Sequence, residues 1–365
     1  MLKKKKAILV LQDGTAYSAE GIGACCTKAG ELVFNTSMTG YQEALSDPSY
    51  AGQILIMTYP LIGNYGFSKE WQESDKVYVR GFCVRMAENA PTHFKSGSNL
   101  DKFLQDNEVG AIVGLDTRSI VRKIRNKGVM PAALQIHEAG EEPDMKTLLK
   151  LAKETDYSKI DCVTGASCKK IITHGEGKIK IALIDYGAKG NIINELLERK
   201  MQVMQFPHNA SAEEIKKCSP HGIILSNGPG DPARLGAEVN EIKKLLDFPI
   251  MGICLGHQLL GCAAGAKTYK LKFGHRGSNH PVMDLRTKKV AITTQNHGYA
   301  LDEKTISNGW EITHLNLNDN TVEGIAHKTL PIFSVQFHPE AHPGPRDSEY
   351  LFDKFLKLIK DGKNA

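Results

Sequence analysis

The stretch PIMGICLGHQLLGCAAGA, residues 249–266, predicts a sharp turn in the fold. Residues 249–253 have the composition of a short buried strand, and residues 255–264 have the apolar spacing of a packed helix. Cys254 falls at the corner between them. Gly252 and Gly256 flank it and remove the Cβ atoms that would clash in so tight a bend.

Two interpretations of Cys254 follow from this stretch. The expected geometry matches the G-x-S-x-G nucleophile elbow, with sulfur in place of oxygen. A thiol in the first turn of a helix lies beside free backbone N–H groups and the positive end of the helix dipole, which favour the thiolate. A small core cysteine at a glycine-rich junction fits the stretch equally well, so the rest of the chain must decide.

The composition is that of a soluble globular protein. A chain of 365 residues favours two domains, and 41% hydrophobic and 24% charged residues are ordinary values. A net charge of +5 is too small to indicate nucleic acid, and the basic run 3–6 fits a solvated strand end. We find no apolar run of ~20 residues and no secretion signal, so we expect no membrane association and a cytoplasmic location. The eight cysteines include no C-x-x-C and predict free thiols.

The pattern of elements changes along the chain and predicts two domains. Residues 1–140 predict a smaller, β-rich mixed α/β domain, with strands at 7–11, 31–35, 53–57, 77–84 and 111–114. Residues 141–177 are more polar and predict a linker, partly filled by a helix near 145–153. Residues 178–365 alternate strands and helices, which predicts a doubly wound, mostly parallel sheet with helices on both faces.

In such sheets, ligands collect at the carboxyl ends of the strands. Three stretches with chemical character fall at predicted strand ends: DYG at 185–187, SNGPGDP at 226–232, and the corner at Cys254. The longer run DYGAKGN, 185–191, lacks a phosphate-loop pattern and predicts a tight strand-to-helix turn.

A cysteine nucleophile requires a base and a group that orients the base. A predicted strand at 332–337 leads into His338-Pro-Glu340. A carboxylate two residues from a histidine can orient its ring and stabilise the imidazolium. His-Pro-Glu alone is a weak signal, but together with a cysteine elbow in the same α/β domain it becomes a strong one.

The oxyanion that such a nucleophile generates needs hydrogen-bond donors. Gly228 and Gly230 allow backbone N–H groups to turn inward and approach a ligand closely. An elbow supplies a second donor from the residue after the nucleophile, here Leu255. An ordinary Asn-Gly-Pro-Gly turn is the alternative interpretation of the glycine-rich stretch.

Together these motifs resemble the class I, triad-type glutamine amidotransferases, whose catalytic domain is flavodoxin-like. The resemblance implies that Cys254 is the nucleophile, His338 the general base and acid, and Glu340 its orienting carboxylate. It implies oxyanion donors at the N–H groups of Gly228 and Leu255. The positions that match the family's glutamine contacts are Gly228, Gly230, Leu255, Gln258, Asn296, Gly298 and Tyr299.

The N-terminal half narrows the resemblance. FNTSMTGYQEALSDPSYAGQILIMTYPLIGNYG, 34–66, together with FGHRGSNHPV and QNHGYA, closely resembles the small chains of carbamoyl-phosphate synthetases, over essentially the whole sequence. Ser49 matches the one glutamine contact of the N-terminal domain in that family. The resemblance implies that L-glutamine is hydrolysed to glutamate and ammonia, and that the ammonia passes to a large synthetase chain in a heterodimer or higher oligomer.

The resemblance also predicts which groups this chain lacks. ATP, Mg²⁺ and bicarbonate would bind to the large chain, and we find no nucleotide motif here. We predict no metal site, because the spacing of His275, His280 and His297 fits no standard site and glutamine hydrolysis needs no metal. His257 is expected to pack or form a hydrogen bond locally.

Two alternatives to this prediction remain, one a different class I enzyme and the other a protein of a different class. A free-standing γ-glutamyl hydrolase, or a glutaminase that serves another synthase, would lack the N-terminal domain. A catalytically silent binding subunit would not need Cys254, His338 and Glu340 all intact. The sequence leaves open whether the product serves pyrimidine synthesis, arginine synthesis or both.

Overall fold

The computed structural model describes residues 5–362 and divides into two compact units, residues 1–160 and 161–365. The division falls inside the segment 141–177 that we predicted to be a linker. The helix α4 (Met145–Glu154) at the start of this segment packs Leu148 and Ala152 against strands of the N-terminal unit. Among the residues described, no helix is long and apolar enough to cross a membrane.

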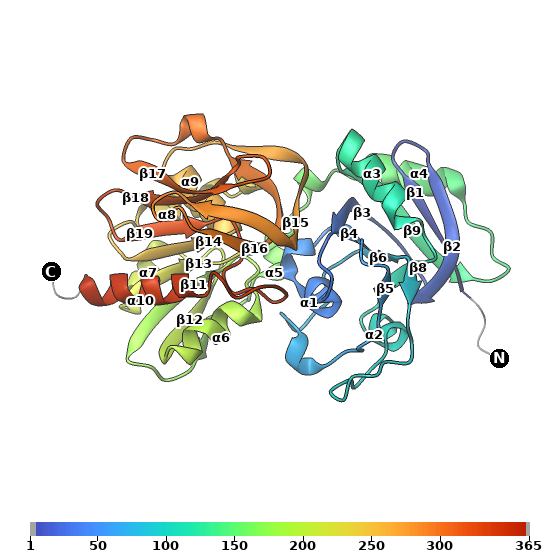
Figure 1. Ribbon diagram of the computed structural model, residues 1–365, viewed down its shortest axis with the longest axis horizontal. Coiled ribbons are helices and arrows are strands. Elements are labelled where there is room, and N and C mark those ends of the chain that lie inside the picture. The colour runs from blue at the N-terminus through green and yellow to red at the C-terminus, as the bar shows by residue number, and fades with distance from the viewer. Residues whose placement is uncertain (1–4, 363–365) are drawn as a thin grey trace. The chain divides into compact units, whose positions relative to one another are not determined.

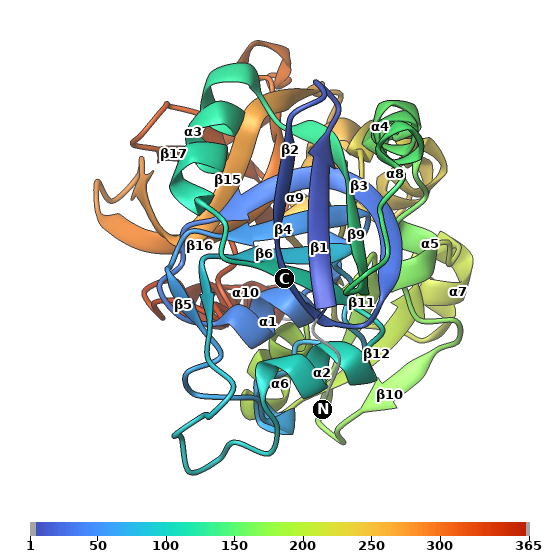
Figure 2. The same cartoon turned by 90° about the vertical axis from the view of Figure 1, so that its right-hand side faces the viewer.

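The N-terminal unit is built on a closed barrel with strand order β1-β2-β8-β6-β4-β3-β9 (Figure 2). Its strands are β1 (Lys5–Leu11), β2 (Ala16–Gly23), β3 (Cys26–Asn35), β4 (Gln53–Met57), β6 (Gly81–Val84), β8 (Gly110–Val113) and β9 (Met130–Glu138). The other elements are β5 (Leu61–Ile62) and β7 (Met86–Ala87), which pair with each other, and the helices α1 (Tyr41–Ser46), α2 (Leu100–Asp106) and α3 (Thr117–Lys127). The sequence predicted neither β2 nor β9, which both pair with β1.

The C-terminal unit contains a ten-stranded sheet with order β10-β12-β11-β13-β14-β19-β18-β17-β15-β16 (Figure 1). The strands are β10 (Ile172–His174), β11 (Ile179–Asp185), β12 (Met201–Pro207), β13 (Gly222–Leu225), β14 (Ile250–Ile253), β15 (Thr268–Asp284), β16 (Val290–Leu301), β17 (Trp310–Asn316), β18 (Val322–His327) and β19 (Ile332–Val335). The parallel pairs join β12, β11, β13, β14 and β19, in that spatial order. All other neighbouring strands of the sheet are antiparallel. The predicted α/β class is confirmed, and its parallel core is extended by an antiparallel half that we had not predicted.

Helices cover both faces of this sheet. Side chains of successive strand residues point to opposite faces, and because both sets are apolar, each face needs a cover. On β11, Ala182 and Ile184 join one core, while Ile181 and Leu183 join the other. The first core includes residues of α7 (Ala212–Lys217), α8 (Gly236–Lys243) and α9 (Leu255–Ala263), and the second includes residues of α6 (Gly190–Glu198) and α10 (Tyr350–Asp361). The short α5 (Val163–Ala166) precedes the sheet and packs Val163 on the first core.

Candidate active site

Cys254 occupies a strained corner between β14 and α9. Its backbone has φ 53° and ψ −105°, a left-handed conformation that is rare for a residue with a side chain. A Cβ atom at Gly256 would lie 2.1 Å from the carbonyl oxygen of Leu225, and one at Gly252 would lie 2.8 Å from that of Gly256. Only glycine fits at either side, so the corner has the geometry of a nucleophile elbow.

The three predicted catalytic side chains come together at the carboxyl ends of β14 and β19. The Nδ1–H group of His338 donates to Glu340 Oε1 at 2.7 Å, and both side chains are almost completely buried. This bond fixes the tautomer, so that Nε2 is the nitrogen available for proton exchange. The Cys254 thiol donates to the carbonyl oxygen of Asn296 at 3.6 Å. Among the described residues, His338 Nε2 has no well-aligned hydrogen-bond partner, as often occurs before a substrate binds.

The charges around the histidine favour its cationic form. Burial by itself lowers the pKa of His338, but the negative charge of Glu340 and the neighbouring Cys254 side chain outweigh burial and raise it to about 10. Burial raises the pKa of Glu340, but Lys189 and His338 outweigh burial and lower it to about 2. The site is therefore arranged to hold a buried carboxylate beside an imidazolium.

The structure adds Lys189, which no motif in the sequence predicted. Its ammonium group lies 3.2 Å from Glu340 Oε1, is itself buried, and also donates to the carbonyl oxygen of Ala341. Asn191 Nδ2 donates to the carbonyl oxygen of Glu340 at 2.6 Å. Both residues follow β11 in the run DYGAKGN, so a polar run at a parallel strand end was the available signal.

The predicted oxyanion donors lie close together. A Cβ atom at Gly228 would lie 2.9 Å from Leu255 Cδ2 and 2.4 Å from the carbonyl oxygen of Tyr186, so the loop after β13 passes directly beside the elbow. Leu255 is the first residue of α9, where backbone N–H groups lack intrahelical acceptors. Gly230 has φ 95°, a conformation that favours glycine.

The predicted glutamine contacts on β16 also reach the elbow. Gln258 of α9 donates through Nε2 to the carbonyl oxygen of Tyr299 at 2.8 Å and to Gln336 Oε1 at 3.0 Å. The backbone N–H of His338 donates to Thr294 of the same strand, two residues before Asn296. Gly298 lies between Asn296 and Tyr299, so the segment 296–299 is held against both α9 and the residues that follow β19.

Two further residues were named from the sequence. Ser49 belongs to the N-terminal unit, where it is buried and its N–H donates to Asp47 Oδ1 at 2.9 Å. Its contact with glutamine therefore stays a prediction. His257 is fully buried, and its Nδ1 forms a hydrogen bond with Ser334 Oγ at 2.8 Å. Burial lowers the pKa of His257 to about 3, which keeps it neutral and agrees with the local packing role that we expected.

Comparisons with known proteins identify the two domains. Residues 182–358 match the family model for glutamine amidotransferase class-I, and residues 9–134 match that for the carbamoyl-phosphate synthase small chain, CPSase domain. The carbamoyl phosphate synthase small chain of Methanocaldococcus jannaschii is 49% identical over 362 residues, covering 98% of this chain and 100% of the relative. That of Clostridium acetobutylicum is 48% identical, covering 97% and 100%. The crystal structure of a putative GMP synthase protein from Thermoplasma acidophilum superposes with a TM-score of 0.46 and 21% identity, over 52% of this chain and 98% of that one.

The doubly wound sheet and the elbow at Cys254 thus define a class I glutamine amidotransferase domain. With its N-terminal domain and its full-length relatives, the chain belongs to the family of carbamoyl-phosphate synthase small chains.

Proposed function

We propose that this chain hydrolyses L-glutamine to glutamate and ammonia through a γ-glutamyl thioester on Cys254. The observation that carries the proposal is the strained elbow of Cys254, at which His338, Glu340 and Lys189 form a buried chain of alternating charge. A strained nucleophile, an oriented base and nearby backbone donors are the parts that acyl transfer requires.

In the first half-reaction, His338 Nε2 holds the proton of the Cys254 thiol as an imidazolium, and the sulfur attacks the side-chain amide carbon of glutamine. The carbonyl oxygen becomes an oxyanion, for which the N–H groups of Gly228 and Leu255 are the proposed donors. The C–N bond then breaks as His338 Nε2–H protonates the departing nitrogen, which leaves as ammonia. Glu340 remains ionised throughout and stabilises the imidazolium.

In the second half-reaction, water attacks the thioester carbon while His338 Nε2 accepts its proton. The C–S bond breaks, glutamate leaves, and the proton returns to the sulfur. Gly230, Gln258, Asn296, Gly298 and Tyr299, with Ser49 of the N-terminal unit, are proposed to hold the amino-acid end of the substrate. These contacts orient the amide carbon above Cys254 Sγ.

We further propose that the ammonia is delivered to a large synthetase chain, which makes carbamoyl phosphate from bicarbonate and ATP. ATP and Mg²⁺ would bind to that chain, and this chain would carry no cofactor for its own reaction. The association with a large chain is supported by the N-terminal domain, which matches the family model for the small chain. A cytoplasmic location and a role in pyrimidine or arginine synthesis, or in both, complete the proposal.

The test compares two cysteines at opposite ends of α9. Cys254→Ser should lower the rate of glutamine hydrolysis by ~10³-fold or more, because the serine hydroxyl is far less acidic than the thiol. Cys262→Ser is the matched control, since Cys262 lies near the end of α9 and burial raises the pKa of its thiol, which makes it a poor nucleophile.

With the large chain present, the Cys254→Ser complex should still make carbamoyl phosphate from added ammonia. Near-normal glutamine hydrolysis by Cys254→Ser would refute the assignment of the nucleophile. Loss of the ammonia-dependent reaction as well would refute the proposed division of labour between the chains.

A further inference from the structure

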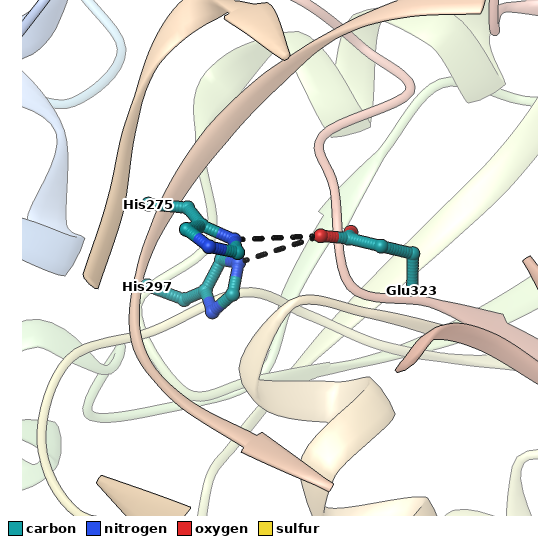
Figure 3. A group of neighbouring side chains, drawn as sticks. All are labelled: His275, His297 and Glu323. Carbon is teal, nitrogen blue, oxygen red and sulfur yellow. Dashed lines mark ion pairs between the residues drawn. The ribbon is translucent and has the colours of Figure 1, made fainter. Parts of the chain in front are cut away.

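Three buried side chains that the triad does not use meet on the antiparallel half of the C-terminal sheet. His275 lies on β15, His297 lies directly opposite it on β16, and Glu323 lies on β18. Figure 3 shows one ring nitrogen of each histidine pointing at the same carboxylate oxygen. From the spacing of its histidines the sequence led us to predict no metal site, because the third member of this cluster, Glu323, is far from both histidines along the chain.

The separations of these atoms fit a divalent ion. His275 Nδ1 lies 3.5 Å and His297 Nε2 lies 4.0 Å from Glu323 Oε1, and one ligand atom from each residue lies within 4.8 Å of the others. Bonds of ~2.1 Å to a tetrahedral zinc ion place its ligand atoms about 3.4 Å apart. A small inward movement of His297 would therefore complete the geometry.

Each of the three groups is oriented by a second partner. His275 Nε2 is bonded to Asp319 Oδ2 at 2.8 Å, and His297 Nδ1 is bonded to the carbonyl oxygen of Tyr299 at 2.7 Å. Gln295 Nε2 donates to the other oxygen of Glu323 at 2.9 Å. A carboxylate or carbonyl behind a histidine ligand fixes the tautomer with its lone pair towards the metal, as in many zinc sites.

The strongest sign of a missing partner is His297 Nε2. The Nδ1–H group already donates to Tyr299, so Nε2 carries a lone pair that faces the carboxylate of Glu323. This nitrogen is buried and has no hydrogen-bond partner among the described residues, and the side chain is only 2% exposed. A cationic His275 between Asp319 and Glu323 would contact both carboxylates and balance one of their two negative charges, but it would leave His297 Nε2 unsatisfied.

We propose that His275, His297 and Glu323 bind one divalent transition-metal ion, of which zinc best suits two imidazoles and a carboxylate. Asn316 Nδ2 also donates to Glu323 Oε1 at 2.9 Å, which leaves that oxygen a second lone pair for the ion. The ion ties β15, β16 and β18 together, and its ligand His297 lies within the segment 296–299. Its role is structural, since the thioester chemistry needs no metal, and the site does not depend on the proposed reaction.

The test measures metal binding in the full chain carrying Cys254→Ser, which removes a thiol that could itself bind metal. After chelation and dialysis, the protein is titrated with Zn²⁺, and the bound metal is counted by mass spectrometry. Co²⁺ is then used as a spectroscopic probe. We expect about one equivalent of zinc, a tetrahedral cobalt spectrum without a thiolate charge-transfer band, and a rise in Tm of about 5 °C with saturating zinc.

Glu323→Gln and His275→Asn should each lose this binding, with circular dichroism to confirm that the variants fold. Two variants are used because Glu323→Gln would place an NH2 group against the donors of Gln295 and Asn316. A loss of binding in that variant alone would then have a second cause. His174→Asn is the control, since β10 lies at the opposite edge of the sheet from β16, and it should retain one equivalent. Less than ~0.1 equivalent in the parent chain, or undiminished binding in both folded variants, would overturn the proposal.

Discussion

Replacement of Lys189 by methionine should damage both stability and catalysis, although Lys189 is no part of the triad. Its ammonium group lies 3.2 Å from Glu340 Oε1, and the two side chains are 2% and 0% exposed. Methionine keeps most of the side-chain volume but removes the charge. The variant therefore leaves Glu340 in a buried site with His338 as its remaining charged partner.

The magnitude follows from the pKa of Glu340. Lys189 and His338 outweigh burial and bring the pKa from 4.5 to about 2, which corresponds to about 3 kcal/mol of stabilisation of the folded state. Because the folded pKa is the lower one, this contribution is present above pH ~4.5 and is lost as the pH falls towards 2. Lys189→Met removes only the share that Lys189 contributes, but it also breaks a buried ion pair and leaves Glu340 with one charged partner, so we expect the free energy of unfolding to fall by about 3 kcal/mol.

Trp310 allows the C-terminal unit to be followed alone. It is one of two tryptophans in the chain, and the other is Trp71 of the N-terminal unit. In a Trp71→Phe background, urea unfolding monitored by fluorescence reports on Trp310. Lys180→Met, an exposed lysine of the same unit, is the matched control and should change the unfolding free energy by less than ~0.5 kcal/mol.

The catalytic effect separates a positioning role from a purely structural one. Lys189 holds Glu340 and the following carbonyl, so its loss should lower kcat by ~10- to 100-fold while the KM for glutamine changes little. Destabilisation alone would lower the amount of active protein without moving the pH profile. The acid limb of kcat should move to higher pH, because the pKa of Glu340 rises. Unchanged stability together with an unchanged pH profile would refute this reasoning.

Four other predictions can be checked on the same preparations. Glu340→Gln removes the negative charge that raises the pKa of His338, so the basic limb of the pH–rate profile should move below its wild-type position, and an unmoved limb would contradict the assignment. Ser49→Ala should raise the KM for glutamine by ~10- to 100-fold with a smaller change in kcat, as measured by steady-state kinetics. Gly256→Ala should lower the free energy of unfolding by about 3 kcal/mol in a urea titration, because the new Cβ would meet the Leu225 carbonyl, and a loss below about 1 kcal/mol would contradict the clash. The isolated chain should hydrolyse glutamine slowly and accelerate when the large chain is added, and equal turnover in both states would argue against coupling.

The local sequence determined the elbow and the class of the C-terminal domain. Gly252 and Gly256 could be recognised without the structure, because a strand that turns at once into a helix leaves no room for side chains beside Cys254. The alternation of strands and helices from residue 178 predicted the parallel core, since short βα connections of this kind place strands side by side. His338 and Glu340 were recognisable because they are two residues apart.

Contacts between distant segments could not be predicted from local sequence patterns. The barrel of the N-terminal unit is closed by the pairing of β1 with β9, whose paired residues, from Lys5 with Glu138 to Leu11 with Ala132, are more than a hundred positions apart. Lys189 and Glu340 are separated by some 150 residues, and no local pattern links a lysine after one strand to a carboxylate after another.

The cluster of His275, His297 and Glu323 also depends on contacts between distant segments. Antiparallel pairing sets His275 against His297, and packing brings the carboxylate of β18 to both. A chain specifies its turns through neighbouring residues, whereas the burial and the charges of a site depend on which strands become neighbours in the sheet. The nucleophile was therefore predictable from the sequence, but the environment that sets the protonation of its base was decided by the tertiary structure.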